Sequence, residues 1–182
     1  MNHAYTAVKA VSLPTQSQLK PTFSSADFAD AYAVPLPDGA TTDPEQLARF
    51  ILSNQAPWVS VLMKMRDGLV RRFGLKTADQ LSQSDGAVDD RRVAIFKIYE
   101  SGPYEILLGE DDSHLDFRIS VLCQDLARIT PAGASVVLST VVHCHNRLGR
   151  NYIRLIAPFH KAIVQSSLRR AARQGWPRAQ TH

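Results

Sequence analysis

Every second residue between positions 115 and 123 is apolar, and no other feature of the sequence limits its fold as strongly. The apolar positions are Leu115, Phe117, Ile119, Val121 and Cys123. The polar positions beside them are His114, Asp116, Arg118 and Ser120. Because residues two apart on a β-strand point to the same face, this stretch predicts a strand with one apolar and one polar face.

Similar stretches lie on both sides of this strand, and no helical pattern separates them. They are RVAIFKIYESG (92–102), YEILLGEDD (104–112) and SVVLSTVVHCHN (135–146). Parallel neighbours need a long crossover connection, so the short connections predict four or five antiparallel strands. In the last stretch, the alternation places Thr140 inward with the apolar residues, which puts His143 and His145 outward. That outward side also holds Val137 and Val141, so the assignment of the histidines could reverse near the end of the strand. Residues 27–36 add an extended segment, predicted at an edge because Pro35 lacks a backbone N–H.

Three stretches have the three- and four-residue spacing of amphipathic helices. The first covers 44–54 and follows Asp43, a good N-cap residue. The second covers 57–73 and is followed by glycine. The third covers 149–174, and Pro158 inside it predicts a kink or a division into two helices.

These elements predict an α+β fold, an antiparallel sheet with helices on one face, because the strands alternate instead of being apolar on both sides. A chain of 182 residues is usually one domain, and we expect that domain to cover residues 26–176. Residues 1–25 are rich in Ser, Thr, Gln and Pro, which predicts a flexible arm. Residues 177–182 are expected to form a disordered tail.

Four segments within residues 26–172 are similar to those of a known family. They are ADFADAYAV, PWVSVLMKMRDGLVRRFGLK, LGEDDSHLDFRISVL and STVVHCHNRLGRNYIRLIAPFHKAIVQSSLRRA. They resemble the bacterial family DUF2867, and the element order resembles the helix-grip fold of the START/Bet v 1-like (SRPBCC) superfamily. That resemblance implies a curved antiparallel sheet around a long C-terminal helix, often with a cavity between them, but no established activity. Similar domains are sometimes attached to a nicotinamide-binding Rossmann domain, whose G-x-G-x-x-G motif after a strand this chain lacks.

Charge is distributed unevenly along the chain. The net charge is +4, yet no Asp or Glu follows Asp125, and nine basic residues do. A basic segment can mark a nucleic-acid surface, but aromatic and glycine-rich RNA motifs are absent. We therefore expect no nucleic-acid partner, and interpret the asymmetry as two parts of one fold that face each other.

The apolar content predicts a cytoplasmic protein without a membrane partner. No apolar run reaches the roughly 18 residues that span a bilayer, and the N-terminus lacks the apolar block of a signal peptide. Cys123 and Cys144 lie in apolar alternating stretches, where reduced and buried thiols are expected.

His143 and His145 form the first candidate site, because both point to one face of a predicted strand. Together with Asp112, His114 or Asp116 on the neighbouring strand, they could hold a divalent metal with an open position. Histidines at this spacing are also ordinary on a solvated sheet face. We favour hydrogen bonds to nearby carboxylates, and expect no metal and no other cofactor.

A run of acids, residues 110–112, forms the second candidate at a predicted turn. Two carboxylates perform acid–base catalysis when burial drives their pKa values apart, but water at a turn keeps both ionised. We expect ion pairs with nearby arginines instead. Those arginines are Arg118, Arg147 and Arg150.

His160 is the third candidate, since it leans toward the buried stripe of the last helix. A hydrogen-bonded core histidine is the default interpretation. The alternative places His160 on a cavity wall beside Phe159, as a ligand contact or a proton acceptor.

We expect a binding module in which the last helix closes over the apolar sheet face and leaves room for a small apolar or amphipathic ligand. The alternative is an enzyme, cyclase- or dehydratase-like or a metal-assisted hydrolase, that uses histidines in the same cavity. Catalytic residues remain unassigned, and a homodimer is left open. The candidate ligand contacts are Trp58, Met65, His114, Arg118, His143, His145, Tyr152, Phe159 and His160.

Overall fold

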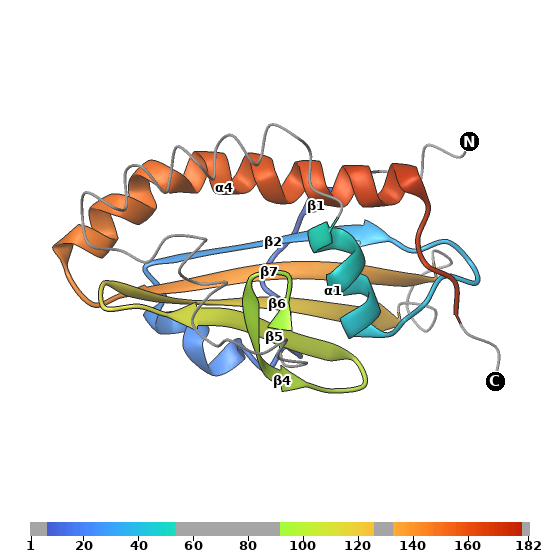
Figure 1. Ribbon diagram of the computed structural model, residues 1–182, viewed down its shortest axis with the longest axis horizontal. Coiled ribbons are helices and arrows are strands. Elements are labelled where there is room, and N and C mark those ends of the chain that lie inside the picture. Colours follow the sequence, from blue (N-terminus) through green and yellow to red (C-terminus); the bar gives the residue numbers. More distant parts are fainter. Residues whose placement is uncertain (1–6, 54–91, 126–132, 180–182) are drawn as a thin grey trace.

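The computed structural model describes residues 7–53, 92–125 and 133–179, which contain a seven-stranded sheet, two α-helices and a short 3-10 helix (Figure 1). The strands are β1 Lys9–Ala10, β2 Phe28–Pro35, β3 Arg92–Val93, β4 Phe96–Ser101, β5 Glu105–Asp111, β6 Leu115–Asp125 and β7 Ala134–Cys144. The helices are η2 Lys20–Ser25, α1 Pro44–Ser53 and α4 Arg147–Gln174. The strand order is β1-β2-β7-β6-β5-β4-β3, and every neighbouring pair is antiparallel. The α+β class and the antiparallel pairing are confirmed.

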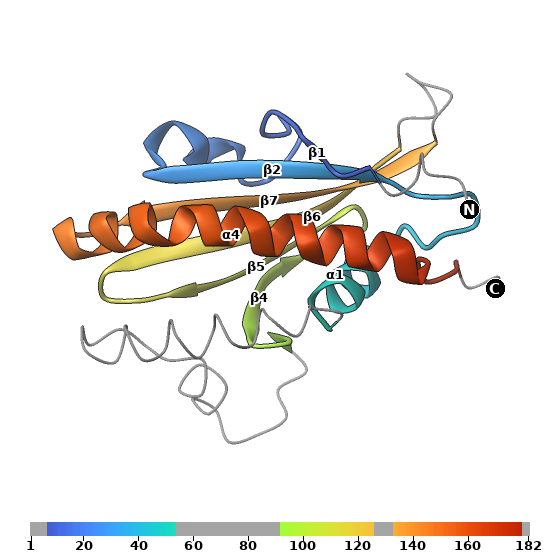
Figure 2. The same ribbon diagram turned by 90° about the horizontal axis from the view of Figure 1, so that it is seen from above.

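The two α-helices cover one face of the sheet, which we call the inner face, and η2 lies on the opposite, outer face (Figures 1 and 2). Helix α4 runs along the strands and contacts β2 and β7, while α1 packs over β5 and β6. The prediction that helices share one face therefore holds for α1 and α4. The 3-10 helix was not predicted.

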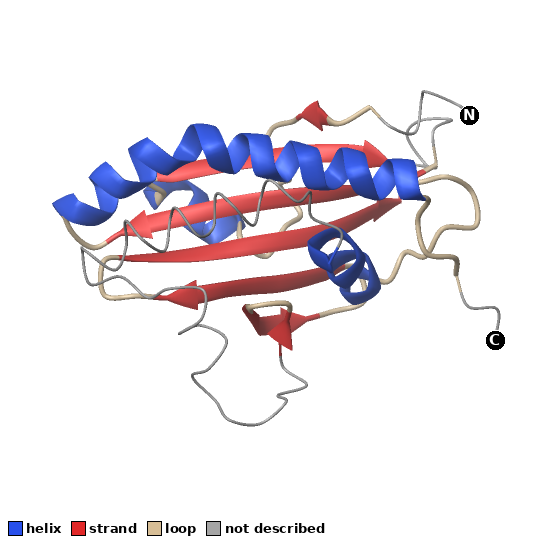
Figure 3. Cartoon of the chain, turned by 45° about the horizontal axis from the view of Figure 1, so that its top comes forward, coloured by secondary structure: helices blue, strands red, loops and turns tan. Residues whose placement is uncertain are grey.

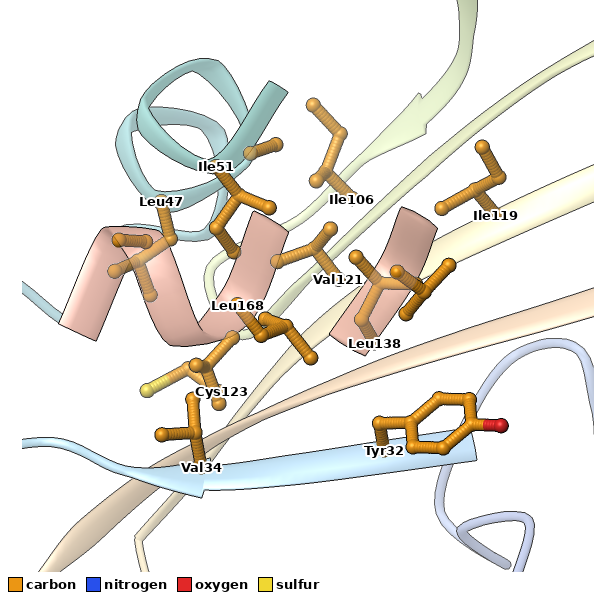
Figure 4. Packing of buried hydrophobic residues seen from close by; sticks show 14 of the residues in the cluster. Tyr32, Val34, Leu47, Ile51, Ile106, Ile119, Val121, Cys123, Leu138 and Leu168 are labelled. Atoms are coloured by element: carbon orange, nitrogen blue, oxygen red, sulfur yellow. The ribbon is translucent and has the colours of Figure 1, made fainter. Parts of the chain in front are cut away.

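The core lies between the inner face and the two α-helices. Leu47 and Ile51 of α1 and Leu168 of α4 are fully buried and point toward Ile106 and Val121 on the sheet (Figure 4). The inward positions predicted from the alternation all lie on this face. From β6 and β7 they contribute Ile119, Val121, Cys123, Val136 and Leu138 to the largest apolar cluster.

Helix α4 is one helix of 28 residues that passes through Pro158, so the predicted division into two helices is wrong. The Asn146 side chain caps its start by accepting a hydrogen bond from Gly149 N at 3.0 Å. The buried residues of its second half are Val164, Ser167, Leu168 and Ala171, whereas those of its first half are only Gly149 and Ile153. Its second half therefore anchors the helix to the sheet.

The N-terminal strap, residues 14–26, crosses the outer face. Leu19 is buried against Leu107 and Val141. The Glu105 carboxylate accepts hydrogen bonds from the side chain of Ser17 and the backbone N–H of Gln18. The prediction of a flexible arm is therefore wrong for the described part of residues 1–25.

The C-terminal segment is also ordered beyond the predicted domain boundary. Thr41 N donates a 2.7 Å hydrogen bond to Pro177 O, and Arg178 forms an antiparallel bridge with Ala40. Residues 177–179 thus pair with the chain before α1, contrary to the disordered tail predicted for them.

Candidate functional site

A row of polar side chains, the polar band, crosses the inner face between two apolar clusters. It comprises Asp30 of β2, Thr140 of β7 and His160 of α4. Asp30 and Thr140 are direct partners in the β2–β7 register. The larger cluster lies on one side and includes Tyr32, Val34, Leu138 and Leu168. The smaller lies on the other and includes Leu115, Val142, Cys144 and Ile153. The band is thus a polar line in an apolar interface.

Asp30 and His160 form the ionisable pair of this band. The imidazole Nε2 lies 3.3 Å from Asp30 Oδ1, and only 22% of the His160 side chain and 9% of the Asp30 side chain are exposed. The Phe28 ring meets the imidazole edge-on at 5.5 Å between centroids. These contacts fix the orientation of the imidazole, because one ring nitrogen is held by the carboxylate and the ring by Phe28.

Two oxygen atoms of the band lack the hydrogen bonds that burial demands. Asp30 Oδ2 and Thr140 Oγ1 are buried, and neither has a hydrogen-bond partner among the residues that the structure describes. Leaving a buried polar atom unsatisfied costs roughly 1–3 kcal/mol, and more for a charged group. The inner face therefore presents two acceptors, one of them also a donor, that a bound donor group would satisfy.

Tyr32 lies two residues after Asp30 and faces the same way. Burial raises the pKa of its hydroxyl, a hydrogen bond with the Gln165 side chain lowers it, and the charge of the Asp30 carboxylate and a hydrogen bond with that carboxylate raise it again. The phenol therefore stays protonated at neutral pH and remains a hydrogen-bond donor beside the band.

Two hollows of the described surface lie elsewhere. One, of about 600 Å³, is open and lies over the start of α1, lined by residues that include Asp43, Glu45 and Gly102. Another lies on the last turns of α4. Neither hollow is the predicted cavity between the sheet and α4, and the second half of α4 packs directly on the core.

The outward histidines of β7 make separate contacts. His145 Nε2 lies 3.0 Å from Asp116 Oδ1, so of the contacts with nearby carboxylates expected for both histidines, the one for His145 is found and the one for His143 is not. His143 Nε2 lies 3.2 Å from Thr22 O and 3.1 Å from Ser25 Oγ, both in the strap. Among the residues that the structure describes, no three His, Cys, Asp or Glu side chains gather as a metal site would require.

Arg118 lies on the same outer face, in a contact of its own. Its guanidinium pairs with Asp111 at 2.7 Å and stacks on Tyr99, 3.6 Å from the ring centroid. A side chain on Gly109 would collide with Phe117 O and Arg118, so this glycine makes room for the crossing arginine. Burial and the Asp111 carboxylate raise the pKa of Tyr99 to about 12.

Of the expected ion pairs between the acids and arginines, the one with Arg118 is therefore confirmed. Arg150 instead pairs with Asp27, at 3.1 Å. The Asp27 carboxylate also accepts a 2.7 Å hydrogen bond from Cys144 N, and this bond is the main cause that lowers its pKa. Asp27 thus ties the end of the strap to the start of α4.

The remaining predicted contacts are scattered. His114 Nδ1 lies 2.8 Å from Asn146 Nδ2, Tyr152 packs on the smaller apolar cluster, and Phe159 is 47% exposed. Trp58 and Met65, with the predicted helix 57–73, lie outside the described residues. The predicted set is therefore divided: His160 is on the inner face, and His143, His145 and Arg118 are on the outer face.

Sequence reasoning missed Asp30, which pairs with His160. The sequence does contain a signal for it. Phe28, Asp30, Tyr32 and Val34 are spaced two apart and therefore share one face of a strand, and Asp30 is the only charged residue among these four. The pairing itself links residues 130 positions apart, and no local pattern encodes that contact.

The profile of one protein family matches residues 22–167, most of the chain, and its description is "Protein of unknown function (DUF2867)". The chain belongs to this family. No curated protein matches it at a significant level. The match includes the polar band and α4 as far as Ser167, but begins within η2, so the first half of the strap lies outside it. Among the described residues of this DUF2867 protein, no helix has both the length and the apolar content to cross a membrane.

Proposed function

We propose that this DUF2867 protein is a binding module for a small apolar or amphipathic molecule, which lies against the inner face beneath the first half of α4. One observation carries the proposal: Asp30 and Thr140 are register partners on β2 and β7, and Asp30 Oδ2 and Thr140 Oγ1 are buried without a hydrogen-bond partner among the described residues. A ligand with a hydrogen-bond donor and an apolar body would satisfy these atoms and cover the apolar clusters beside them.

The packing of α4 supports the location. Its second half is anchored in the core, while few residues of its first half are buried. A ligand that needs room would therefore displace the first half at lower cost than the second. We also assign the arrangement to the helix-grip fold of the START/Bet v 1-like superfamily, supported by the position of α4 along the sheet (Figure 3).

We place the protein in the cytoplasm. Cys123 and Cys144 are buried thiols that are not joined in a disulfide, which suits a reducing compartment. Burial, with the nearby Asp27 carboxylate, raises the pKa of Cys144 to about 11, so this thiol is unreactive at neutral pH.

A fluorescent amphipathic amine, 1-aminoanthracene, tests the proposal because it joins an N–H donor to a flat apolar body. We expect saturable binding with one site per chain, and displacement by other amphipathic molecules. Thr140→Val removes the unsatisfied hydroxyl on the inner face while keeping the side-chain shape. It should weaken binding about three- to tenfold, the value of one hydrogen bond of about 0.5–1.5 kcal/mol.

Ser139→Ala is the matched control. The Ser139 hydroxyl is also buried and without a hydrogen-bond partner among the described residues, but it lies on the outer face of the same strand. Removal of an unsatisfied hydroxyl should leave the unliganded protein as stable as before or more stable, in both variants. Only the inner-face variant should lose affinity. Equal affinities of the two variants, or the absence of a saturable site, would contradict the proposal.

The Asp30–His160 pair favours a second candidate, an enzyme that uses the imidazole as a general base. A carboxylate that orients an imidazole is a common arrangement for proton transfer. Molecules that bind can be incubated with the protein and followed by mass spectrometry. Turnover that is lost in His160→Gln, with binding retained, would establish this candidate over the binding module.

A further inference from the structure

The outward face of the last turns of α4 carries a basic hollow. Its volume is about 360 Å³, and its lining consists of Ser166, Arg169, Arg170, Arg173 and Gln174. These residues lie on one side of the helix, away from Leu168 and Ala171, which are buried in the core. We call this group the arginine hollow. It is separate from the polar band, and the proposed ligand does not use it.

Among the described residues, the charge of the arginine hollow has no acidic counterpart. Within that part of the chain Arg170 and Arg173 make no ion pair, and Arg169 donates only to the neutral Gln165 side chain, at 2.8 Å. No acidic residue follows Asp125 in the chain. Arginines three and four positions apart on a helix repel each other by a few tenths of a kcal/mol per pair. The hollow is thus an uncompensated cluster of positive charge.

The helix dipole accounts for only part of this cluster. Cations are stabilised at a helix C-terminus, but the effect fades within the last turn, and Arg173 is the basic residue of that turn. Arg169 and Arg170 lie one turn earlier. The dipole therefore gives no reason for three arginines around one hollow.

The lining selects the chemistry of the occupant. All five described lining residues supply hydrogen-bond donors, and none of these five is a carboxylate. The hollow over α1 differs, because Asp43 and Glu45 line it and its arginine, Arg49, is already paired with Glu45 at 2.7 Å. Guanidinium groups match the oxygens of a phosphate in pairs, and hydroxyl and amide donors complete its shell.

We propose that the arginine hollow binds a phosphate monoester, with Arg170 and Arg173 as the main contacts. A free phosphate dianion and the phosphate group of a larger small molecule share this chemistry. The two sources are distinguished by titrating inorganic phosphate and phenyl phosphate in parallel. Tighter binding of phenyl phosphate means that the organic part also makes contacts.

The test follows the arginine Nε–Hε signals of the full chain by NMR, at constant ionic strength maintained with sodium chloride. We expect saturable shifts of the Arg169, Arg170 and Arg173 signals with either phosphate. The double variant Arg170→Gln/Arg173→Gln should bind about 100-fold more weakly or worse, as expected when two charge-assisted hydrogen bonds of roughly 1.5 kcal/mol or more each are lost.

The control is the double variant Arg147→Gln/Arg154→Gln, which removes the same charge from the exposed first half of α4. It should bind phosphate like the wild-type protein. Equal loss in both double variants would reduce the effect to net charge and overturn the proposal. So would linear, unsaturable shifts, or a preference for single-stranded oligonucleotides that falls steeply with salt, which would indicate a nucleic-acid surface.

Discussion

Replacement of Leu168 by alanine should lower the free energy of unfolding by about 3 kcal/mol, a typical cost of truncating a fully buried leucine. Leu168 has no exposed surface and packs where α4 meets the sheet, near Leu138 and Val34. Truncation leaves a cavity in the largest apolar cluster, in the part that joins the second half of α4 to the sheet. Denaturant unfolding measures the change as a shift of the midpoint at constant slope.

Leu155→Ala is the matched control on the same helix. Leu155 is 55% exposed, so its truncation should change stability by no more than about 0.5 kcal/mol. The pair tests which half of α4 is anchored. Equal effects of the two variants would mean that the second half does not hold the helix on the sheet, and the proposed ligand position beneath the first half would lose its basis.

The inward and outward faces of the long strands could be predicted from sequence because strand periodicity is local. The parity of β6 and β7 assigned Thr140 to the inner face, in agreement with the structure. It left open whether His143 points outward or inward near the end of the strand, and the structure places this histidine on the outer face, against the strap. The start of α1 could also be predicted from a local signal, the N-cap residue Asp43. In the structure Asp43 Oδ1 accepts hydrogen bonds from Glu45 N and Gln46 N, as the side chain of an N-cap residue does.

The β3–β4 hairpin was not predicted, because its turn contains neither glycine nor asparagine, the residues that usually mark such a turn in a sequence. The stretch from Arg92 to Ser101 reads as one strand, but a two-residue turn divides it after Val93. Ala94 takes a positive φ of 55° there, a conformation that glycine or asparagine usually marks in a sequence.

The strap and the polar band could not be predicted because long-range contacts create them. A polar, proline-containing segment such as residues 14–26 suggests a flexible arm until a buried partner is found for it. That partner is Glu105, 88 positions after Ser17. Asp30 and His160 are likewise joined only when α4 lies over β2. Periodicity assigns a residue to a face, whereas its partner depends on the complete fold.

Replacement of Glu105 by alanine should destabilise the protein by about 3 kcal/mol and release the strap. The Glu105 carboxylate is 5% exposed and accepts hydrogen bonds from the Ser17 and Ser120 hydroxyls and from Gln18 N. Its removal leaves three donors beneath the strap without an acceptor, at roughly 1–3 kcal/mol for each that water cannot reach. Denaturant unfolding gives the total, and faster hydrogen exchange of the amides of Gln18 and Leu19 reports the release.

Glu100→Ala separates this anchor from an ordinary surface contact. The Glu100 carboxylate accepts a 2.8 Å hydrogen bond from the same strap residue, through Gln18 Nε2, but this bond is exposed to solvent. Water replaces an exposed acceptor, so the cost should stay below about 1 kcal/mol and the exchange of Leu19 should not change. If the two variants behaved alike, the strap would be held by its apolar contacts with Leu107 and Val141, and the buried carboxylate would not be its anchor.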